Sequence, residues 1–216
     1  GGVGSGTTVE HCEVALNLDD GFEFFGGTVN VKWLSALFVG DDAFDVDEGY
    51  QGSGQFLFAM VGVDGNHGTE IDSKTGGNLD SQPRSHPAFY SMTIIGGGTR
   101  SARDSNAIMR LREGTGGKFG NVILANAGGQ HTGVEVRDCG SETRTQDLPA
   151  PSVSIGQVGT PDSGYLFFSK NNVVAGANPP FAFDRGCPDE GWQAVYADPG
   201  IYEGGWLVSG GQVWRG

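Results

Sequence analysis

Acidic residues stand in closely spaced groups near the start of the chain. Asp19 and Asp20 are adjacent, Asp41 and Asp42 are adjacent further along, and Asp45 follows them. Carboxylates gathered in this way repel one another unless a positive charge lies between them. Ca²⁺ is a hard cation that prefers oxygen ligands, so these five residues are candidate calcium ligands. The chain has no EF-hand loop, so the site would be formed by the fold.

A repeated apolar pattern indicates the elements that position these acids. Each of five units begins with three spaced residues: Val9, Cys12 and Val14; Val31, Leu34 and Ala36; Phe56, Ala59 and Val61; Phe89, Met92 and Ile94; Phe119, Val122 and Leu124. An alternating pair follows in each unit: Phe22 and Phe24; Phe44 and Val46; Thr69 and Ile71; Met109 and Leu111; Val134 and Val136. Alternation at period two, punctuated by Gly, Asp or Asn, predicts short half-buried strands.

The spacing of the units predicts the fold class. Units of about 20 to 30 residues leave no room for the helix that a βαβ crossover needs, so each strand pairs with its copy one turn away. The expected fold is all-β, a right-handed parallel β-helix of about five to six turns over residues 1–177. Residues 178–216, rich in glycine and aromatic residues, are expected to form an irregular strap packed on the coil.

The ends and the longest connections of this coil are also predicted. A solenoid needs capping elements, and the first strand begins too early to leave room for one, so we expect earlier N-terminal turns or a docked subunit. Extra residues at 73–86, 96–105 and 139–161 are expected to form loops that project from the coil.

Stacked turns would align the outward residues of the second strands in columns. One predicted column reads Glu23, Asp45, Glu70, Arg110 and Glu135, and a neighbouring one reads Phe25, Asp47, Asp72, Arg112 and Arg137. Two interpretations stay open. The acids at the end without arginine bind Ca²⁺, or the columns form an exposed salt-bridge surface in which each pair contributes at most about 1 kcal/mol.

Composition excludes several classes of partner. The chain has 26 acidic and 13 basic residues among 216, a formal net charge of −13, which disfavours nucleic acids and anionic lipids. No apolar run is long enough to span a membrane. The 39 glycines follow no Gly-X-Y period, which excludes collagen and fits a turn-rich β protein.

Three cysteines cannot all pair within one chain. Cys12 occupies an inward position and is expected to be a buried thiol. Cys139 and Cys187 are expected to form a disulfide between coil and strap if the compartment is oxidising.

The coil pattern over residues 8–175 resembles the pectin-lyase-like group of right-handed parallel β-helices. The segments Gly-Ser-Gly-Thr-Thr-Val at 4–9, Asp-Asp-Gly-Phe-Glu-Phe-Phe-Gly-Gly-Thr-Val-Asn at 19–30 and Gly-Asp-Asp-Ala-Phe-Asp-Val-Asp-Glu-Gly-Tyr at 40–50 resemble uncharacterised secreted or cell-surface β-helix proteins of bacteria and algae. That resemblance implies an extracellular protein and assigns no chemistry.

A second resemblance is to polygalacturonase-like glycoside hydrolases, on Asn17-Leu18-Asp19, Asp41-Asp42, Asn66-His67-Gly68 and Arg110-Leu111-Arg112 in that order. It implies inverting hydrolysis, with Asp42 as general acid, Asp19 and Asp41 activating water, His67 orienting, and Arg110 with Arg112 holding a uronate. The chain departs from the pattern at Asn66 and at Arg112, where that family has glycine and lysine.

Three functions follow from these observations. The first is a non-enzymatic extracellular structural protein of a surface layer, filament or matrix, stabilised by Ca²⁺ and self-associating through its open ends. The alternative is a polysaccharide-active enzyme of the polygalacturonase type. The third is a carbohydrate-binding module that stacks sugars on Trp33, Trp192 or Trp206.

Overall fold

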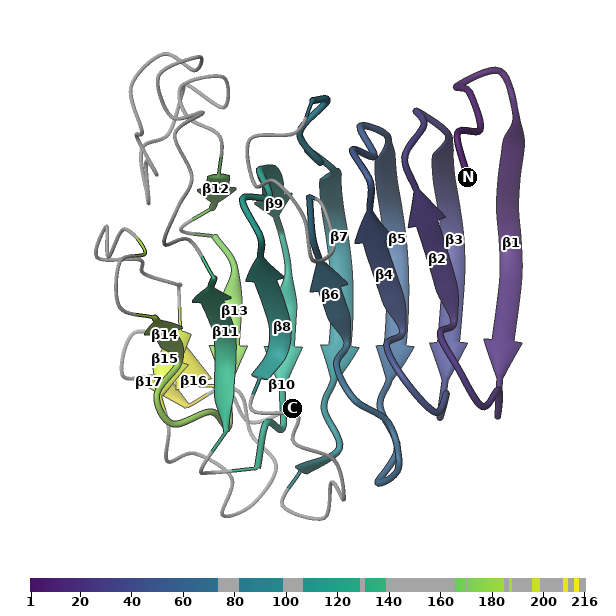
Figure 1. Ribbon diagram of the computed structural model, residues 1–216. Coiled ribbons are helices and arrows are strands. Elements are labelled where there is room, and N and C mark those ends of the chain that lie inside the picture. Colours follow the sequence, from purple (N-terminus) through teal and green to yellow (C-terminus); the bar gives the residue numbers. More distant parts are fainter. Residues whose placement is uncertain are drawn as a thin grey trace.

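Alternating apolar and polar segments form parallel strands in the computed structural model of the chain, which is a right-handed parallel β-helix (Figure 1). The structure describes residues 1–73, 82–98, 107–128, 131–138, 166–169, 171–184, 187, 196–198, 208–209 and 212–213. None of these residues forms a helix that is long and apolar enough to cross a membrane.

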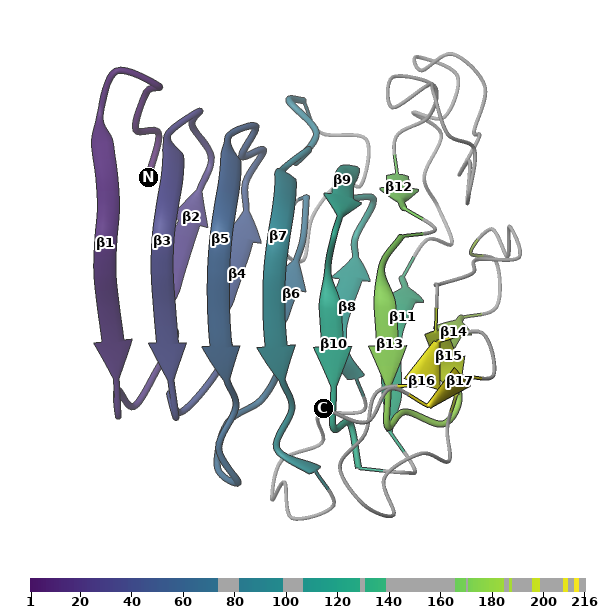
Figure 2. The ribbon, with the colours of Figure 1, turned by 180° about the vertical axis from the view of Figure 1, so that it is seen from behind.

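The strands form two large sheets, and all strand pairs within these two sheets are parallel (Figures 1 and 2). Sheet A contains β1 (Thr8–Ala15), β3 (Asn30–Leu37), β5 (Ser53–Met60), β7 (Ala88–Ile95), β9 (Gly117–Gly120), β10 (Ile123–Ala125), β12 (Leu166–Phe168), β13 (Val173–Ala175) and β15 (Tyr196–Asp198). Sheet B contains β2 (Phe22–Phe25), β4 (Phe44–Asp47), β6 (Thr69–Ile71), β8 (Ala107–Arg112), β11 (Thr132–Arg137) and β14 (Phe181–Phe183). A separate antiparallel pair consists of β16 (Val208–Ser209) and β17 (Gln212–Val213).

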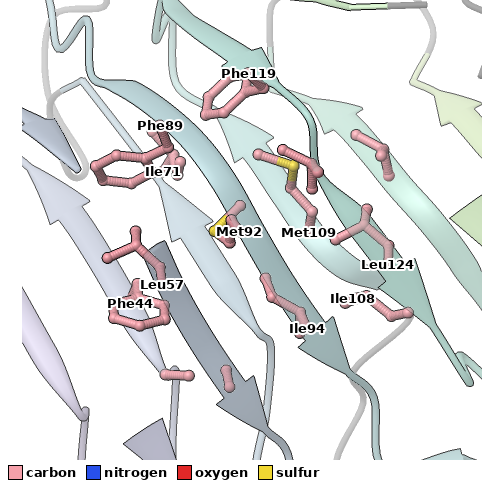
Figure 3. Close-up of a cluster of buried hydrophobic side chains, with 14 of the residues drawn as sticks. Phe44, Leu57, Ile71, Phe89, Met92, Ile94, Ile108, Met109, Phe119 and Leu124 are labelled. Carbon is pink, nitrogen blue, oxygen red and sulfur yellow. The ribbon is translucent and has the colours of Figure 1, made fainter. Parts of the chain in front are cut away.

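The core lies between the two sheets and consists of inward side chains stacked turn upon turn. In sheet B the register pairs Phe44 with Phe22 on one side and with Thr69 on the other, as the alternating pattern predicts. Figure 3 shows part of this core, with side chains from both sheets directed toward each other: Phe44, Leu57, Ile71, Phe89, Met92, Ile94, Ile108, Met109, Phe119 and Leu124. Burial of these apolar side chains is the main stabilising contribution to the coil.

The inward residues of the third unit were predicted two positions too far along the chain, at Phe56, Ala59 and Val61. The inward positions of β5 are Gly54, Leu57 and Ala59, which pair with the inward residues of β3 and β7. Phe56 instead lies on the outer face and is 43% exposed. Cys12 also differs from its expected burial, because it lies on the outermost strand β1 and is exposed.

A left-handed residue recurs at one position of sheet A and explains the uneven spacing of the pattern. His11, Trp33, Phe56, Ser91 and Asn121 have φ between 52° and 61°. A residue in this conformation bends the strand, so that two outward residues separate the first and second inward ones. The three-residue step from Val9 to Cys12 is therefore a property of the strand, and it recurs in the turns that contain β3, β5, β7 and β10.

Part of the expected coil and strap lies outside the described residues. The number of turns and the boundary at residue 177 stay predictions, although β14 and β15 beyond that boundary pair with β11 and β13. Trp192, Trp206 and Trp214 of the expected strap lie outside the described residues, as does most of each expected loop.

Candidate functional site

The outward residues of sheet B form the charged columns that the sequence predicts. The register places Asp45 between Glu23 and Glu70, and places Arg110 between Glu70 and Glu135. Neighbouring members of such a column lie about 4.8 Å apart along the sheet. Short strands of sheet B thus hold charges from five turns in one line.

Arginines neutralise the column at β6, β8 and β11. Arg110 donates from Nε to Glu135 Oε2 at 2.9 Å and from Nη1 to Glu70 Oε1 at 3.4 Å. Arg112 donates from Nε to both carboxylate oxygens of Asp72 at 2.9 Å and from Nη2 to Glu70 Oε2 at 2.8 Å. Both guanidinium groups therefore face carboxylates of the protein, and a uronate would compete with these partners.

The five predicted metal ligands gather at the other end, on the turns that lead into β2 and β4. Carboxylate oxygens of Asp20, Asp42 and Asp45 lie within 4.8 Å of one another, and those of Asp19, Asp20 and Asp41 form a second such group. Asp20 belongs to both groups, so the two are continuous. This cluster, which we call the aspartate cluster, contains only oxygen donors.

A hydrogen bond joins the two turns of the aspartate cluster, but none reaches Oδ1 of Asp45. The backbone N–H of Asp42 donates to Asp20 Oδ1 at 3.0 Å, which fixes the two turns relative to each other. Asp45 Oδ1 is buried and accepts no hydrogen bond. A buried acceptor without a partner is costly, and a bound cation would remove that cost.

Burial makes these acids weak. Burial, together with the charge of neighbouring carboxylates, raises the pKa of Asp20 to about 6, of Asp42 to about 7 and of Asp45 to about 9. In the absence of a cation, Asp45 therefore retains its proton at neutral pH. Binding of a divalent cation would displace that proton.

Asp42 also contacts His67, the histidine predicted to orient a catalytic acid. The backbone N–H of His67 donates to Asp42 Oδ1 at 2.6 Å, and the ring Nδ1 lies 2.8 Å from the same oxygen. Burial, together with the charge of Arg110, lowers the pKa of His67 to about 4, so the ring is neutral and Nδ1–H is assigned as the donor. Its Nε2 is buried and has no hydrogen-bond partner.

The predicted catalytic residues are close together but the central pair is enclosed. Asp42 is 3% exposed and His67 is 0% exposed. A small open pocket nearby is lined by residues such as Asn66, Gly96 and Ala107, and neither Asp42 nor His67 lines it. Asp19 and Asp41 lie nearer the surface, and Arg110 and Arg112 are held by Glu70.

Glu70 was predicted as a member of the charged column but not as a residue of the candidate site. Its carboxylate contacts Arg110 and Arg112 and lies 3.7 Å from His67 Nδ1. Glu70 therefore connects the Asp42–His67 pair to the arginines of the column. The column pattern predicts its neighbours within sheet B. The contact with His67 depends on the turn before β6, which the apolar repeat does not determine.

The predicted sugar-stacking residue Trp33 lies on the opposite side of the molecule, on sheet A. Its ring stacks on His11 at 4.3 Å and on Phe56 at 5.8 Å between ring centroids. Both ring faces are therefore covered by neighbours, whereas a sugar stacks on an open face. Trp192 and Trp206 lie outside the described residues, and the carbohydrate-binding function stays a prediction.

Comparison with known families gives one match. A family model described as a pectate-lyase-like β-helix domain matches residues 1–175, which is most of the chain. No curated protein and no solved structure gives a significant match.

Proposed function

The chain belongs to the pectate-lyase-like β-helix domain family, which includes polysaccharide-active enzymes, and within this family we propose a non-enzymatic role for it. The proposed function is that of an extracellular structural protein, a rigid acidic coil in a surface layer, filament or matrix. A Ca²⁺ ion bound by the aspartate cluster would stabilise this coil. The observation that carries the proposal is the convergence of Asp20, Asp42 and Asp45 around a buried oxygen that has no partner.

The residues fit a hard divalent cation. All five side chains of the aspartate cluster supply carboxylate oxygens, the ligand type that Ca²⁺ prefers. The cluster joins two successive turns, because Asp19 and Asp20 precede β2 whereas Asp41, Asp42 and Asp45 lie before and within β4. A cation there would cross-link the turns and stabilise the folded state by mass action.

A calcium titration tests the metal site directly. We expect isothermal titration calorimetry to show binding of Ca²⁺, accompanied by a rise in melting temperature. Asp45→Asn removes the unpartnered carboxylate and should weaken both effects. Glu10→Gln makes the same chemical change on sheet A, away from the cluster, and should leave them unchanged. Absence of heat and of a melting shift in the unmodified protein would refute the calcium proposal.

The extracellular setting also predicts a covalent link. In an oxidising compartment Cys139 and Cys187 should form the predicted disulfide, while Cys12 stays reduced. The backbone N–H of Cys187 donates to Asp184 O next to β14, which supports a position close to the coil. Peptide mapping without reduction should recover the linked pair, and two free thiols in protein from an oxidising compartment would refute it.

A polysaccharide-active enzyme is the second candidate, and the Asp42–His67 pair favours it. A carboxyl group with a pKa near 7 suits a general acid, and His67 would act as its positioning residue. Substrate would have to reach the enclosed Asp42. Release of reducing ends from acidic polysaccharides by the unmodified protein, lost in Asp42→Asn and retained in Glu10→Gln, would favour the enzyme over the structural role.

A further inference from the structure

The outer face of sheet A carries an apolar surface on β3, on β5 and on Phe38, which directly follows β3. Trp33, Phe38 and Phe56 are 43%, 47% and 43% exposed, and Leu37, Phe58 and Met60 beside them are half-buried. We call these six residues the sheet A patch. Figure 2 shows β1, β3, β5 and β7 side by side with no other described element in front of them.

The aromatic rings make the sheet A patch continuous. His11, Trp33 and Phe56 stack on one another with interplanar angles of 17° and 13°, so their edges form one row across three strands. Parallel sheets usually have both faces covered, and exposed apolar patches on soluble proteins mark interaction sites. Packing of the core does not account for this row of aromatic rings, because the rings lie on the outer face of the sheet.

We propose that the sheet A patch binds a second copy of this chain, with sheet A of one protomer packed on sheet A of its partner. Charge supports this occupant. The outward charged residues on β1, β3, β5, β7, β9, β10, β12 and β13 are Glu10, Glu13, Lys32 and Lys118, which sum to zero. The acidic columns of sheet B would lie on the two outer sides of such a dimer, where the net negative charges of the two copies are far apart.

The area of the face is of the same order as that of a protein–protein interface, and its flat shape allows two copies to pack. Strands at about 3.3 Å per residue, stacked about 4.8 Å apart from β1 to β13, give a planar area of roughly 600 Å² before side-chain relief is added. A stable interface buries about 800 Å² on each partner. Two such faces can pack as the sheets of a sandwich do, about 10 Å apart.

This inference deepens the proposed structural role, because the contact would supply lateral self-association in addition to contacts through the ends of the coil. It does not depend on the proposed metal site, which lies where the chain enters β2 and β4 of sheet B. Sedimentation velocity of the full chain over a wide range of concentrations, in chelator and in Ca²⁺, tests it. We expect a concentration-dependent dimer in both conditions.

Asparagine substitutions test the surface itself, because asparagine tolerates the left-handed conformation that Trp33 and Phe56 adopt. Trp33→Asn with Phe56→Asn should raise the dissociation constant of the dimer by about 10- to 100-fold, as expected for aromatic hot spots. Leu18→Asn, which removes a 91% exposed apolar side chain from the turn after β1, should leave it unchanged. Met60→Gln provides an independent variant if the double variant does not fold.

Three results would overturn the inference. These are a monomer at every concentration, a dimer equally stable in the Asn variants, and a monomer retained on insoluble polysaccharide through Trp33. A dimer accompanied by a calcium titration without heat would refute the metal site and leave the interface standing. A dimer that also hydrolyses polysaccharide would refute the structural role alone.

Discussion

Buried aspartates couple the stability of this protein to pH. Asp20, Asp42 and Asp45 have pKa values of about 6, 7 and 9 in the folded chain, against an ordinary value of 3.8. A raised pKa means that folding favours the protonated form, so the stabilisation is complete below pH 3.8 and is lost as pH rises through the folded values. The window therefore extends from acid pH to about pH 9.

We expect the melting temperature in chelator to fall as pH rises across this window. Ca²⁺ binds the ionised carboxylates, so its affinity should rise with pH and the melting temperature should fall less when it is present. Asp45→Asn should flatten the upper part of the decline, because it removes the group with the highest pKa. Thermal melts at several pH values measure these effects, and a melting temperature independent of pH in chelator would contradict them.

Burial also strengthens the electrostatic interactions of Arg110. It lies between Glu70 and Glu135, and all three side chains are mostly buried. Arg110→Gln leaves both carboxylates without this partner and should lower the free energy of unfolding by about 2 to 4 kcal/mol. Lys32→Gln removes an exposed cation near the ring of Trp33 and should cost less than about 1 kcal/mol. Urea denaturation compares them, and equal costs would contradict the role of burial.

The composition of the aspartate cluster was predictable from sequence because its five members follow from two regular features, adjacent acids in turns and alternation in strands. The contact between Glu70 and His67 and the burial of His67 were not predictable from sequence. Both depend on how the turn at residues 66–68 folds against the start of β4, where the backbone N–H of Ala43 donates to His67 O. No period in the sequence encodes that contact.

At the scale of a strand, the misplaced third unit shows what an apolar pattern cannot detect. Phe56 has the stronger apolar signal, but the inward position belongs to Gly54, which has no side chain to recognise. A Cβ at Gly54 would lie 2.9 Å from Cδ1 of Phe89 and 3.0 Å from Cδ1 of Leu57. The glycine therefore leaves the space that the ring of Phe89 fills in the next turn.

Gly54→Ala tests this packing. The added methyl group should displace Phe89 and lower the free energy of unfolding by about 1 to 3 kcal/mol, as overpacking of cores does. Gly4→Ala is the matched control, because nothing lies within 4 Å of a Cβ there. Chemical denaturation measures both variants. An alanine at 54 as stable as glycine would mean that the stacked column has room to adjust.

For the molecule as a whole, the two sheets divide the surface into faces of different chemistry. Sheet B carries the charged columns, and the outward charges of the sheet A strands from β1 to β13 balance. The fold class and the charged columns were predictable from sequence because equivalent positions repeat. The apolar outer face was not, because it rests on residues such as Phe56, which the pattern assigned to the core, and on the left-handed conformation that turns Trp33 outward.

The free energy of local opening should vary along the coil with the number of neighbouring turns that each strand contacts. Each turn of a solenoid contacts only its neighbours. Among the described strands, β1 pairs only with β3, and its inward Val9 and Val14 are only partly buried. β5 lies between β3 and β7. Local opening therefore costs less at β1 than at β5, and the amides of β1 should exchange hydrogen at least about 10-fold faster than those of β5.

Calcium should change this profile in one place. Because the aspartate cluster joins the turns before β2 and β4, bound Ca²⁺ should slow exchange in Phe22–Phe25 and Phe44–Asp47 more than in Thr132–Arg137, which lies turns away. Asp45→Asn should abolish the local slowing and leave β11 unchanged. Hydrogen exchange followed by mass spectrometry resolves these segments. Slowing that is uniform along the coil would place the effect of the ion elsewhere and contradict a cross-link between these two turns.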